Sequence, residues 1–410
     1  MRNLAIAVLM LALSSTLGAE PLLEKTVLFE AGKDGYALYR IPGLVVTPKG
    51  TLLAYCEARK SASGDWGHID IVLRRSTDGG KTWQPRQQIV KIEGNFERNP
   101  AALAQNLGKP GEVTINNPVA IVDQKTHAIH FLYCVEYFRY FYMRSDDDGL
   151  TFSAPIEITG TFEKFKPEYD WKVIATGPAH GIQLKSGRLL VPVWMSTGKG
   201  GHAHRPSVVS TIFSDDAGKT WQRGELAAVD GDLLKNPNET VALELADGRV
   251  MLNMRSESKE NRRALTYSAD GATGWTKPVF HEQLFEPICM ASTTRLSSAA
   301  SGGRNRILFA NPHNLDVAKG EGKPGQSRRR RNLSVKMSYD EGQSWPVNKP
   351  LEPGVSGYSD LAVGSDQAIY CLYECGSAGN DYQTKTLTLA RFNIEWLTDG
   401  KDSLDQGASK

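Results

Sequence analysis

Cysteine is scarce in this sequence. The 410 residues include five cysteines, an odd number, and no pair of Cys-x-x-Cys motifs or neighbouring histidines gives the spacing of a zinc site. Most of them lie in apolar, strand-like runs such as HFLYC and IYCLYEC, which favours buried free thiols over a disulfide framework. The five positions are Cys56, Cys134, Cys289, Cys371 and Cys375. We expect neither a metal nor another cofactor.

The net charge is small, and long hydrophobic runs are few. The formal net charge is +2, so nothing indicates a surface for nucleic acid. Only the N-terminus carries a long apolar run, in which Arg2 precedes the stretch from Leu4 to Leu13 and small residues follow up to Ala19. This pattern is typical of a secretory signal peptide over residues 1–19, the alternative being a buried N-terminal helix. We therefore predict a secreted or periplasmic protein with no membrane span.

A repeated motif is the most informative feature that the sequence does contain. Its pattern is Ser-x-Asp-x-Gly-x-Thr-Trp, with Ser for Thr in one copy and Phe for Trp in another. Four copies begin at Ser76, Ser145, Ser214 and Ser338. A worn copy begins at Ser268 and has Ala272 where the glycine is expected.

The motif has the chemistry of a hairpin turn. Its Ser and Asp side chains can accept hydrogen bonds from backbone N–H groups, its glycine can adopt a positive φ, and its aromatic residue can fill the space between neighbouring sheets. The aspartates of the motif are therefore interpreted as structural. The copies recur about every 65 residues, so the chain without its signal peptide holds about six such units. We predict an all-β fold, a six-bladed β-propeller of four-stranded antiparallel blades, over residues 26–392. A polar C-terminal tail is expected over residues 393–410.

These repeats resemble Asp-boxes, also called BNR repeats. Together with the segment Tyr39-Arg40-Ile41-Pro42, they resemble the exo-α-sialidase, or neuraminidase, family of retaining glycoside hydrolases. The resemblance extends from about residue 26 to 392. It implies an enzyme that removes terminal sialic acid from glycans or glycoconjugates through a tyrosyl-enzyme intermediate. Asp-boxes also occur in propellers without catalytic activity, so they support the fold more strongly than the function.

Arginines are suited to this substrate because sialic acid carries a carboxylate on its anomeric carbon. Planar guanidinium groups stay charged and can bind a carboxylate through two parallel hydrogen bonds. The resemblance implies a set of three arginines, here Arg40, Arg255 and Arg330. The third lies in the run 328–331, where Arg329 and Arg331 are rivals. A nuclear-localisation or polyanion patch is the other interpretation of that run, but export and the low net charge argue against it.

The nucleophile implied by the resemblance is Tyr358, in GVSGYSDLAV, with Glu239 as its base partner. A carboxylate nucleophile would be repelled by the carboxylate at the reacting carbon, whereas a neutral phenol avoids that repulsion. Because a phenol has a pKa near 10, it needs an adjacent base. Glu239 precedes Arg255 by about one hairpin, which predicts neighbouring strands. The alternatives are a core aromatic for Tyr358 and a surface strand residue for Glu239.

The acid/base group implied by the resemblance is Asp65, in a Gly- and Ser-rich loop. Its rival Asp70 lies in the alternating run IDIVL, where a structural role is the better interpretation. Arg59 is expected to contact the sugar ring. Glu374 is a carboxylate within an apolar strand, which requires a partner, and the resemblance implies that it orients Arg40.

Several other residues are candidates for the pocket lining without an assigned role: Trp66, His180, His202 and His204. Two further functions remain open. One is a non-catalytic sialoside-binding or protein-interaction propeller, which would lack one or more catalytic residues. The other is a trans-sialidase, or a hydrolase for another nonulosonic acid, on the same scaffold.

Overall fold

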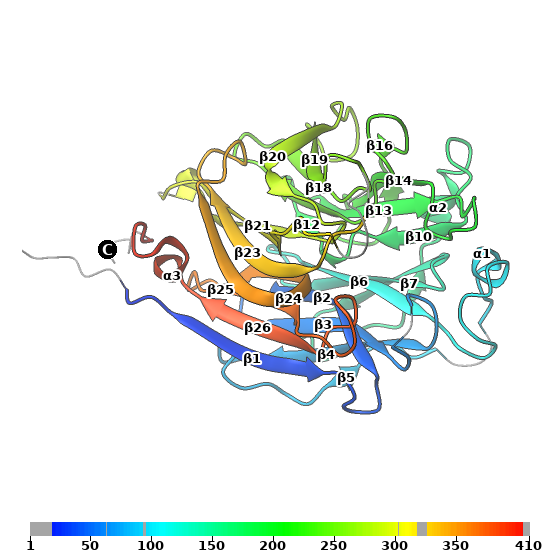
Figure 1. Ribbon diagram of the computed structural model, residues 1–410, viewed down its shortest axis with the longest axis horizontal. Coiled ribbons are helices and arrows are strands. Elements are labelled where there is room, and N and C mark those ends of the chain that lie inside the picture. Colours follow the sequence, from blue (N-terminus) through cyan, green and yellow to red (C-terminus); the bar gives the residue numbers. More distant parts are fainter. Residues whose placement is uncertain (1–18, 63, 93–95, 302, 318–325, 405–410) are drawn as a thin grey trace, which may run out of the picture.

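The computed structural model describes residues 19–404 apart from 63, 93–95, 302 and 318–325. Almost all of the signal peptide predicted over residues 1–19 lies outside the described residues. The described chain is an all-β protein whose strands form five sheets. Strand pairing is antiparallel throughout, apart from the short parallel pair of β11 (Ala179–His180) with β6 (Ile115–Val122). The sheets follow one another in chain order around the molecule (Figure 1).

The first and fourth sheets each come from one continuous part of the chain, whereas the second and third interleave, because β11 joins the second sheet although β10 (Val173–Thr176), which precedes it, belongs to the third. The first contains β2 (Leu38–Val46), β3 (Leu52–Arg59), β4 (Ile69–Ser76) and β5 (Gln87–Gln88). The second contains β11, β6, β7 (Ile129–Val135), β8 (Arg139–Ser145) and β9 (Ile156–Glu157). The third contains β10 (Val173–Thr176), β12 (Ile182–Gln183), β13 (Leu189–Ser196), β14 (Ser207–Ser214), β15 (Gln222–Arg223) and β16 (Ala228–Val229). The fourth contains β17 (Thr240–Glu244), β18 (Val250–Met254), β19 (Arg262–Ser268) and β20 (Val279–Phe285).

The fifth sheet is longer and joins the two ends of the chain. Its order is β1-β26-β25-β24-β23-β22-β21. The first half of β24 pairs with β23 and its second half with β25, so this one long strand links two groups of strands. The bounds are β1 (Leu23–Glu30), β21 (Ser292–Ser297), β22 (Arg306–Pro312), β23 (Arg331–Ser338), β24 (Val347–Val363), β25 (Ile369–Cys375) and β26 (Thr386–Phe392). The count of five sheets therefore differs from the six units expected from the repeat spacing.

Among the described residues, helical structure is confined to short segments between strands and after the last strand. These segments are α1 (Pro100–Leu103), α2 (Gly160–Glu163), α3 (Ile394–Thr398) and the 3₁₀ turn Ala299–Ser301. Ile394 and Leu397 of α3 are buried in the core beside β25 and β26. Asp402 accepts a hydrogen bond from Nη2 of Arg306 at 2.7 Å. The folded chain thus begins before residue 26 and continues past residue 392, beyond both expected boundaries.

The Asp-boxes form the expected turns. At the copy that begins with Ser214, the serine Oγ accepts from the N–H of Gly218 at 2.9 Å, and Asp216 accepts from the N–H of Thr220 at 2.9 Å. The φ of Gly218 is 84°. In the worn copy the glycine stands one residue early: Gly271 has a φ of 75° and donates its N–H to Oγ of Ser268. The turn is therefore retained despite Ala272.

The core fills the spaces between adjacent sheets. Trp345 of the last Asp-box lies in one apolar cluster with Met251 of the fourth sheet and Phe309 of the fifth, and its ring centroid is 5.7 Å from that of Phe309. This confirms the role predicted for the motif's aromatic residue. All five cysteines are free, four of them buried and Cys375 half-buried, in agreement with the sequence.

Candidate active site

Seven of the eight predicted site residues line one cavity of about 520 Å³, although they come from distant parts of the chain. We call this the main cavity. Its volume is in the range of small-molecule sites. The seven residues are Arg40, Arg59, Asp65, Glu239, Arg255, Arg330 and Tyr358. The eighth, Glu374, is buried behind the wall and contacts two of them.

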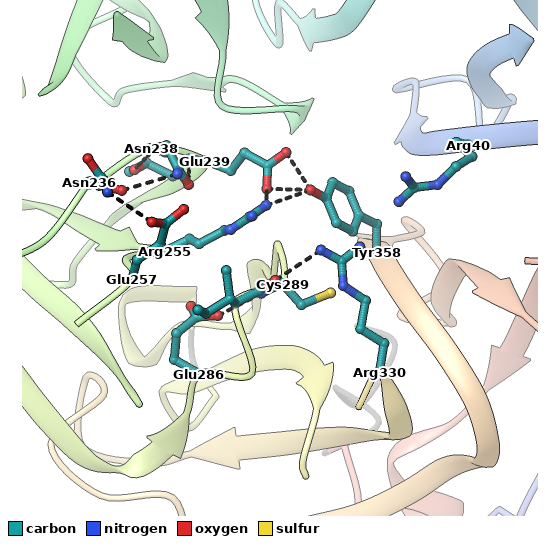
Figure 2. Close-up of polar contacts among 12 residues, drawn as sticks. Arg40, Asn236, Asn238, Glu239, Arg255, Glu257, Glu286, Cys289, Arg330 and Tyr358 are labelled. Carbon is teal, nitrogen blue, oxygen red and sulfur yellow. Dashed lines mark hydrogen bonds and ion pairs between the residues drawn. The ribbon is translucent and has the colours of Figure 1, made fainter. Parts of the chain in front are cut away.

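Tyr358, Glu239 and Arg255 form a closed hydrogen-bonded group (Figure 2). The phenol of Tyr358 lies 2.6 Å from both carboxylate oxygens of Glu239, and Nη1 of Arg255 donates to the phenol oxygen at 2.6 Å. Arg255 also pairs with Glu239. The backbone explains why Glu239 and Arg255 are close to each other. Glu239 directly precedes β17, Arg255 directly follows β18, and the N–H of Arg255 donates to the carbonyl of Glu239. The predicted hairpin is confirmed.

The phenol of Tyr358 is held in its neutral form. Burial raises the pKa of Tyr358 above its usual value, and the positive charge of Arg255 only partly opposes this effect. A proton must therefore leave the phenol during any nucleophilic step, and Glu239 is in direct contact to accept it.

Arg40 and Arg330 flank the ring of Tyr358. Their guanidinium carbons lie 5.1 and 5.0 Å from the ring centroid, within cation–π range. Arg330 also donates to the carbonyl of Ile288 at 2.9 Å. Both guanidinium groups are buried but line the cavity, so two positive charges face the same space as the phenol.

The side chains of Arg329, Arg330 and Arg331, the three candidates in the run 328–331, have different surroundings. Only Arg330 lines the main cavity. Arg329 pairs with Asp381 at 2.9 Å, and 39% of its side chain is exposed. Arg331 begins β23 and lies opposite Val355 of β24. The geometry thus separates the predicted residue from both rivals.

Glu374 supports the site from β25. Its carboxylate accepts from Nε of Arg40 at 2.9 Å and from Nη2 at 3.2 Å. It also accepts from the backbone N–H of Ile41 at 3.3 Å and of Tyr358 at 3.0 Å. The sequence led us to expect the contact with Arg40 but not the contact with the backbone of Tyr358. One buried carboxylate therefore fixes an arginine and the proposed nucleophile together.

Asp65 lies at the edge of the main cavity with 45% of its side chain exposed. Its Oδ1 accepts from Nη1 of Arg59 at 2.9 Å. Burial favours the protonated form of this carboxyl, but the charge of Arg59, with a smaller contribution from Arg40, holds the pKa of Asp65 below its usual range. Arg59 therefore keeps Asp65 ionised.

Glu57 is a site residue that the sequence analysis missed. This fully buried carboxylate on β3 accepts from Nη2 of Arg59 at 2.6 Å and from the backbone N–H of Asn117 at 2.8 Å. It orients the arginine that contacts Asp65. The signal was present, because Glu57 interrupts the apolar run LLAYCEAR in the same way as Glu374 interrupts its own strand.

The remaining candidates divide between several places. His202 and His204 line the main cavity, while Trp66 lines a neighbouring one. His180 lines neither; its Nδ1 lies 2.7 Å from the buried carboxylate of Asp360. Asp70 is structural, as interpreted, since it accepts from the hydroxyl of Tyr36 at 2.6 Å and from Gln88 at 3.0 Å. The pocket-lining expectation for His180 is therefore wrong, because its ring turns toward Asp360.

Two further findings concern metal binding and membrane-spanning helices. Within the part of the chain that the structure describes, no cluster of three or more His, Cys, Asp or Glu side chains is arranged to hold a metal ion. None of the helices formed by the described residues has the length and apolar character needed to span a bilayer.

Comparisons with known proteins show which repeat family the chain contains. A family model described as "BNR repeat-like domain" matches residues 100–371, and one described as "BNR/Asp-box repeat" matches residues 74–85. These matches place the chain among BNR-repeat proteins.

Individual relatives show which kind of BNR-repeat protein this chain resembles. The chain is 30% identical to a sialidase of Micromonospora viridifaciens over 93% of its own length and 55% of the relative's. It is 32% identical to a sialidase of Bacteroides fragilis over 87% of its own length and 63% of the relative's. It thus spans less than two thirds of both relatives. The solved structure of the Hadza microbial sialidase Hz136 matches with a TM-score of 0.71 and 28% identity, over 91% of this chain and 69% of that one. The chain therefore belongs to the exo-α-sialidase family.

Proposed function

We propose that this protein is an exo-α-sialidase, a glycoside hydrolase that releases terminal sialic acid from glycans and glycoconjugates. One observation carries the proposal: a single cavity brings together three arginines, a phenol bonded to a carboxylate, and a separate half-exposed aspartate. A sialoside-binding module would need the arginines but not the Tyr358–Glu239 pair or Asp65. The complete set favours catalysis over binding alone.

The arginines account for recognition of the substrate. The carboxylate of sialic acid would lie between Arg40, Arg255 and Arg330, where charge-assisted hydrogen bonds fix its position. Fixing the sugar over Tyr358 turns the attack into a step within one complex, which removes part of the barrier. Glu374 contributes by holding Arg40 and the backbone of Tyr358 at a constant distance from each other.

The reaction follows from the contacts of Tyr358. Glu239 takes the phenol proton as the phenol oxygen attacks the anomeric carbon, and Arg255 stabilises the charge that develops on that oxygen. Asp65 protonates the departing glycosidic oxygen and then activates a water molecule that breaks the tyrosyl bond. Two successive inversions give net retention at the anomeric carbon.

Asp65 must gain a proton before it can act as an acid. Its contact with Arg59 keeps it ionised before the substrate binds. A bound substrate brings a carboxylate into the same cavity, and this negative charge raises the pKa of Asp65. Substrate binding would thus prepare the acid for its first task.

Product stereochemistry tests this mechanism. Proton NMR of the purified protein acting on a panel of sialosides should show the α-anomer of free sialic acid first, followed by mutarotation. Initial release of the β-anomer would contradict the covalent tyrosine route.

The nucleophile can be tested separately. Tyr358→Phe should lower kcat/KM on a fluorogenic sialoside by orders of magnitude because the phenol oxygen is lost. Circular dichroism and the melting temperature should stay close to those of the unaltered protein, since the ring remains between Arg40 and Arg330. Full activity of this variant would remove the proposed mechanism.

Two further proposals concern the whole chain. We infer that β24 belongs to two blades, one with β21–β23 and one with β25, β26 and β1, so that the five sheets correspond to six propeller blades.

We also infer from the N-terminal pattern that the protein is exported, to a periplasm or to the outside of a cell, where sialylated glycans would be its substrates.

A further inference from the structure

A buried ion pair lies behind the main cavity, outside the residues that line it. Arg263 of β19 donates from Nη1 to Oε2 of Glu286 at 2.5 Å, and no more than 1% of either side chain is exposed. Neither residue lines the main cavity. A buried pair is weak evidence for stability, because the loss of water around both charges offsets much of their attraction. The role of this pair therefore depends on what else the two side chains contact.

Glu286 begins the segment 286–291, which connects β20 of the fourth sheet to β21 of the fifth. Its Oε1 accepts from the N–H of Cys289 at 2.7 Å, and Arg263 donates to the carbonyl of Cys289 at 3.2 Å. Ile288 lies between these two residues with a φ of 63°. A β-branched residue rarely adopts this conformation, so the bonds on either side must hold it. The ion pair thus fixes the direction of the Ile288 carbonyl.

Arg330 depends on that carbonyl for its orientation. Its Nη2 donates to the carbonyl of Ile288 at 2.9 Å, and Figure 2 shows its guanidinium beside Cys289. Among the described residues no carboxylate pairs with Arg330, whereas Arg40 and Arg255 each pair with a glutamate. A neutral carbonyl orients the guanidinium without neutralising its charge, so Arg330 keeps its full attraction for an anionic ligand.

The same ion pair is attached to the strand that leads to Arg255. Arg263 donates from Nε to Oδ1 of Asn253 at 2.6 Å and from Nη2 to the Asn253 carbonyl at 2.7 Å. Asn253 lies in β18, two residues before Arg255. These contacts connect β18 of the fourth sheet to the segment that orients Arg330. Two arginines from different sheets are thereby kept at a constant separation.

This separation matters because a carboxylate bound by several guanidinium groups requires each of them at a defined position. A displacement of about 1 Å in a binding group can cost an enzyme on the order of 100-fold in rate. We propose that Arg263 and Glu286 are positioning residues for the reaction, which act through the carbonyl of Ile288 to hold Arg330 where the substrate carboxylate binds. This inference rests on the proposed sialidase function.

A double-mutant cycle with Arg330 tests the inference. Arg263→Lys keeps a positive charge opposite Glu286 but cannot form all the bonds to Asn253 and Cys289, so the protein should fold while the segment loosens. Its kcat/KM on a fluorogenic sialoside should fall about 10-fold, mainly through KM, because carboxylate binding precedes the chemical step. Arg330→Ala removes the group that is positioned. Adding Arg263→Lys to it should therefore lower kcat/KM by less than about 2-fold further.

Two more variants complete the test. Glu286→Gln should show the same coupling to Arg330→Ala. Because it leaves the buried Arg263 unpaired, its melting temperature should also fall, and the cycle with Arg263→Lys decides if it does not fold. Arg306→Lys is the matched control, since Arg306 is a buried arginine paired with Asp402 at 2.7 Å and lies outside the main cavity. Its kcat/KM should equal that of the unaltered protein.

Losses that multiply in the double variant would give the ion pair a role in the fold alone and would overturn the inference, as would unchanged kinetics of Arg263→Lys. Calorimetric titration with the 2,3-didehydro derivative of sialic acid measures carboxylate binding without turnover. Its affinity should fall about 10-fold in Arg263→Lys, and the double variant should bind it as Arg330→Ala does. If the unaltered protein neither bound this compound nor cleaved the sialoside, the proposed function itself would fail. Binding and cleavage without the coupling would overturn the inference alone.

Discussion

The protonation states of the ionisable side chains in the main cavity depend on the residues around them. Tyr358 stays neutral because it is buried, and Asp65 stays ionised because Arg59 is bonded to it. Arg59 is in turn oriented by Glu57. Two successive contacts, Glu57 with Arg59 and Arg59 with Asp65, thus connect a fully buried carboxylate to the exposed edge of the site. The charge of Arg59, more than the exposure of Asp65, sets the protonation state of the proposed acid.

The pH dependence of activity should report this charge. Arg59 lowers the pKa of Asp65, so Arg59→Gln should raise it, and the acid form should persist to higher pH. The alkaline limb of the kcat/KM profile should therefore move to higher pH, even if the absolute rate falls through a lost sugar contact. Arg59→Lys retains the positive charge and serves as the control, with its limb close to that of the unaltered protein. Superimposable limbs for the Gln variant and the unaltered protein would contradict the assignment of Asp65.

Neighbouring arginines should differ sharply in function. Arg330→Lys keeps the positive charge but removes a planar group that lies over Tyr358 and can form two parallel hydrogen bonds with a carboxylate. The loss of one hydrogen bond to a charged group costs about 1.5–3 kcal/mol, so kcat/KM should fall at least about 10-fold. Arg329→Lys alters only a partly exposed pair with Asp381, which predicts activity near that of the unaltered protein. Steady-state kinetics on one sialoside decides between them, and similar losses in both variants would count against the geometry.

At the scale of elements, β-bulges place the site residues. The registers of β2, β6 and β24 each shift at the main cavity, between Arg40 and Gly43, between Asn116 and Val119, and between Ser356 and Ser359. A bulge leaves residues unpaired and turns side chains away from the regular alternation. The prolines at positions 42 and 118 are tolerated there for the same reason. The bulges thus direct Arg40 and Tyr358 toward one another.

The bulge of β24 requires a glycine. A Cβ at position 357 would stand 2.3 Å from Oε2 of Glu374, the carboxylate that holds Arg40 and the backbone of Tyr358. Gly357→Ala should displace Glu374, lower kcat/KM and destabilise the fold by about 1–3 kcal/mol. Gly354→Ala is the control, because a Cβ there would lie at an ordinary 3.4 Å from Glu352. Urea unfolding and kinetics of both variants measure the effects, and equal behaviour of the two would refute this role for Gly357.

At the scale of the whole molecule, the first strand pairs with the last. β1 pairs with β26 from Leu23 opposite Phe392 to Glu30 opposite Thr386. Leu28 and Phe29 of β1 are buried in the cluster between this sheet and the first one. Figure 1 shows the two ends of the chain side by side in this sheet. The ends of the described chain therefore stabilise each other directly.

Truncation tests this pairing. A chain that starts at Glu20 keeps all of β1 and supplies the reference melting temperature. A chain that starts at Ala31 loses β1, including two buried apolar side chains worth about 1.5–3 kcal/mol each, and exposes the edge of β26. Its melting temperature should drop and it should aggregate more readily, as measured by calorimetry and light scattering. Equal melting temperatures would show that β1 contributes nothing.

Parts of the site could be predicted because the signals were local. Glu239 and Arg255 are a hairpin apart, and a carboxylate in an apolar strand pointed to Glu374. The same signal at Glu57 was overlooked. Arg329 and Arg330 are adjacent residues of the same type, so the sequence does not distinguish them. The structure does, because it shows which of the two side chains faces the ring of Tyr358.

The repeated turns follow from local sequence alone, because the Ser, Asp and Gly of each Asp-box bond to backbone groups within a few residues. The presence of arginines, a tyrosine and carboxylates suited to the site can also be read from the sequence. Which of these side chains come into contact depends on the tertiary structure. Tyr358 and Glu239 are 119 residues apart, and Arg40 and Glu374 are 334 apart. Their contacts depend on how the sheets are arranged around the main cavity and on the bulges of its inner strands, which are long-range consequences of packing.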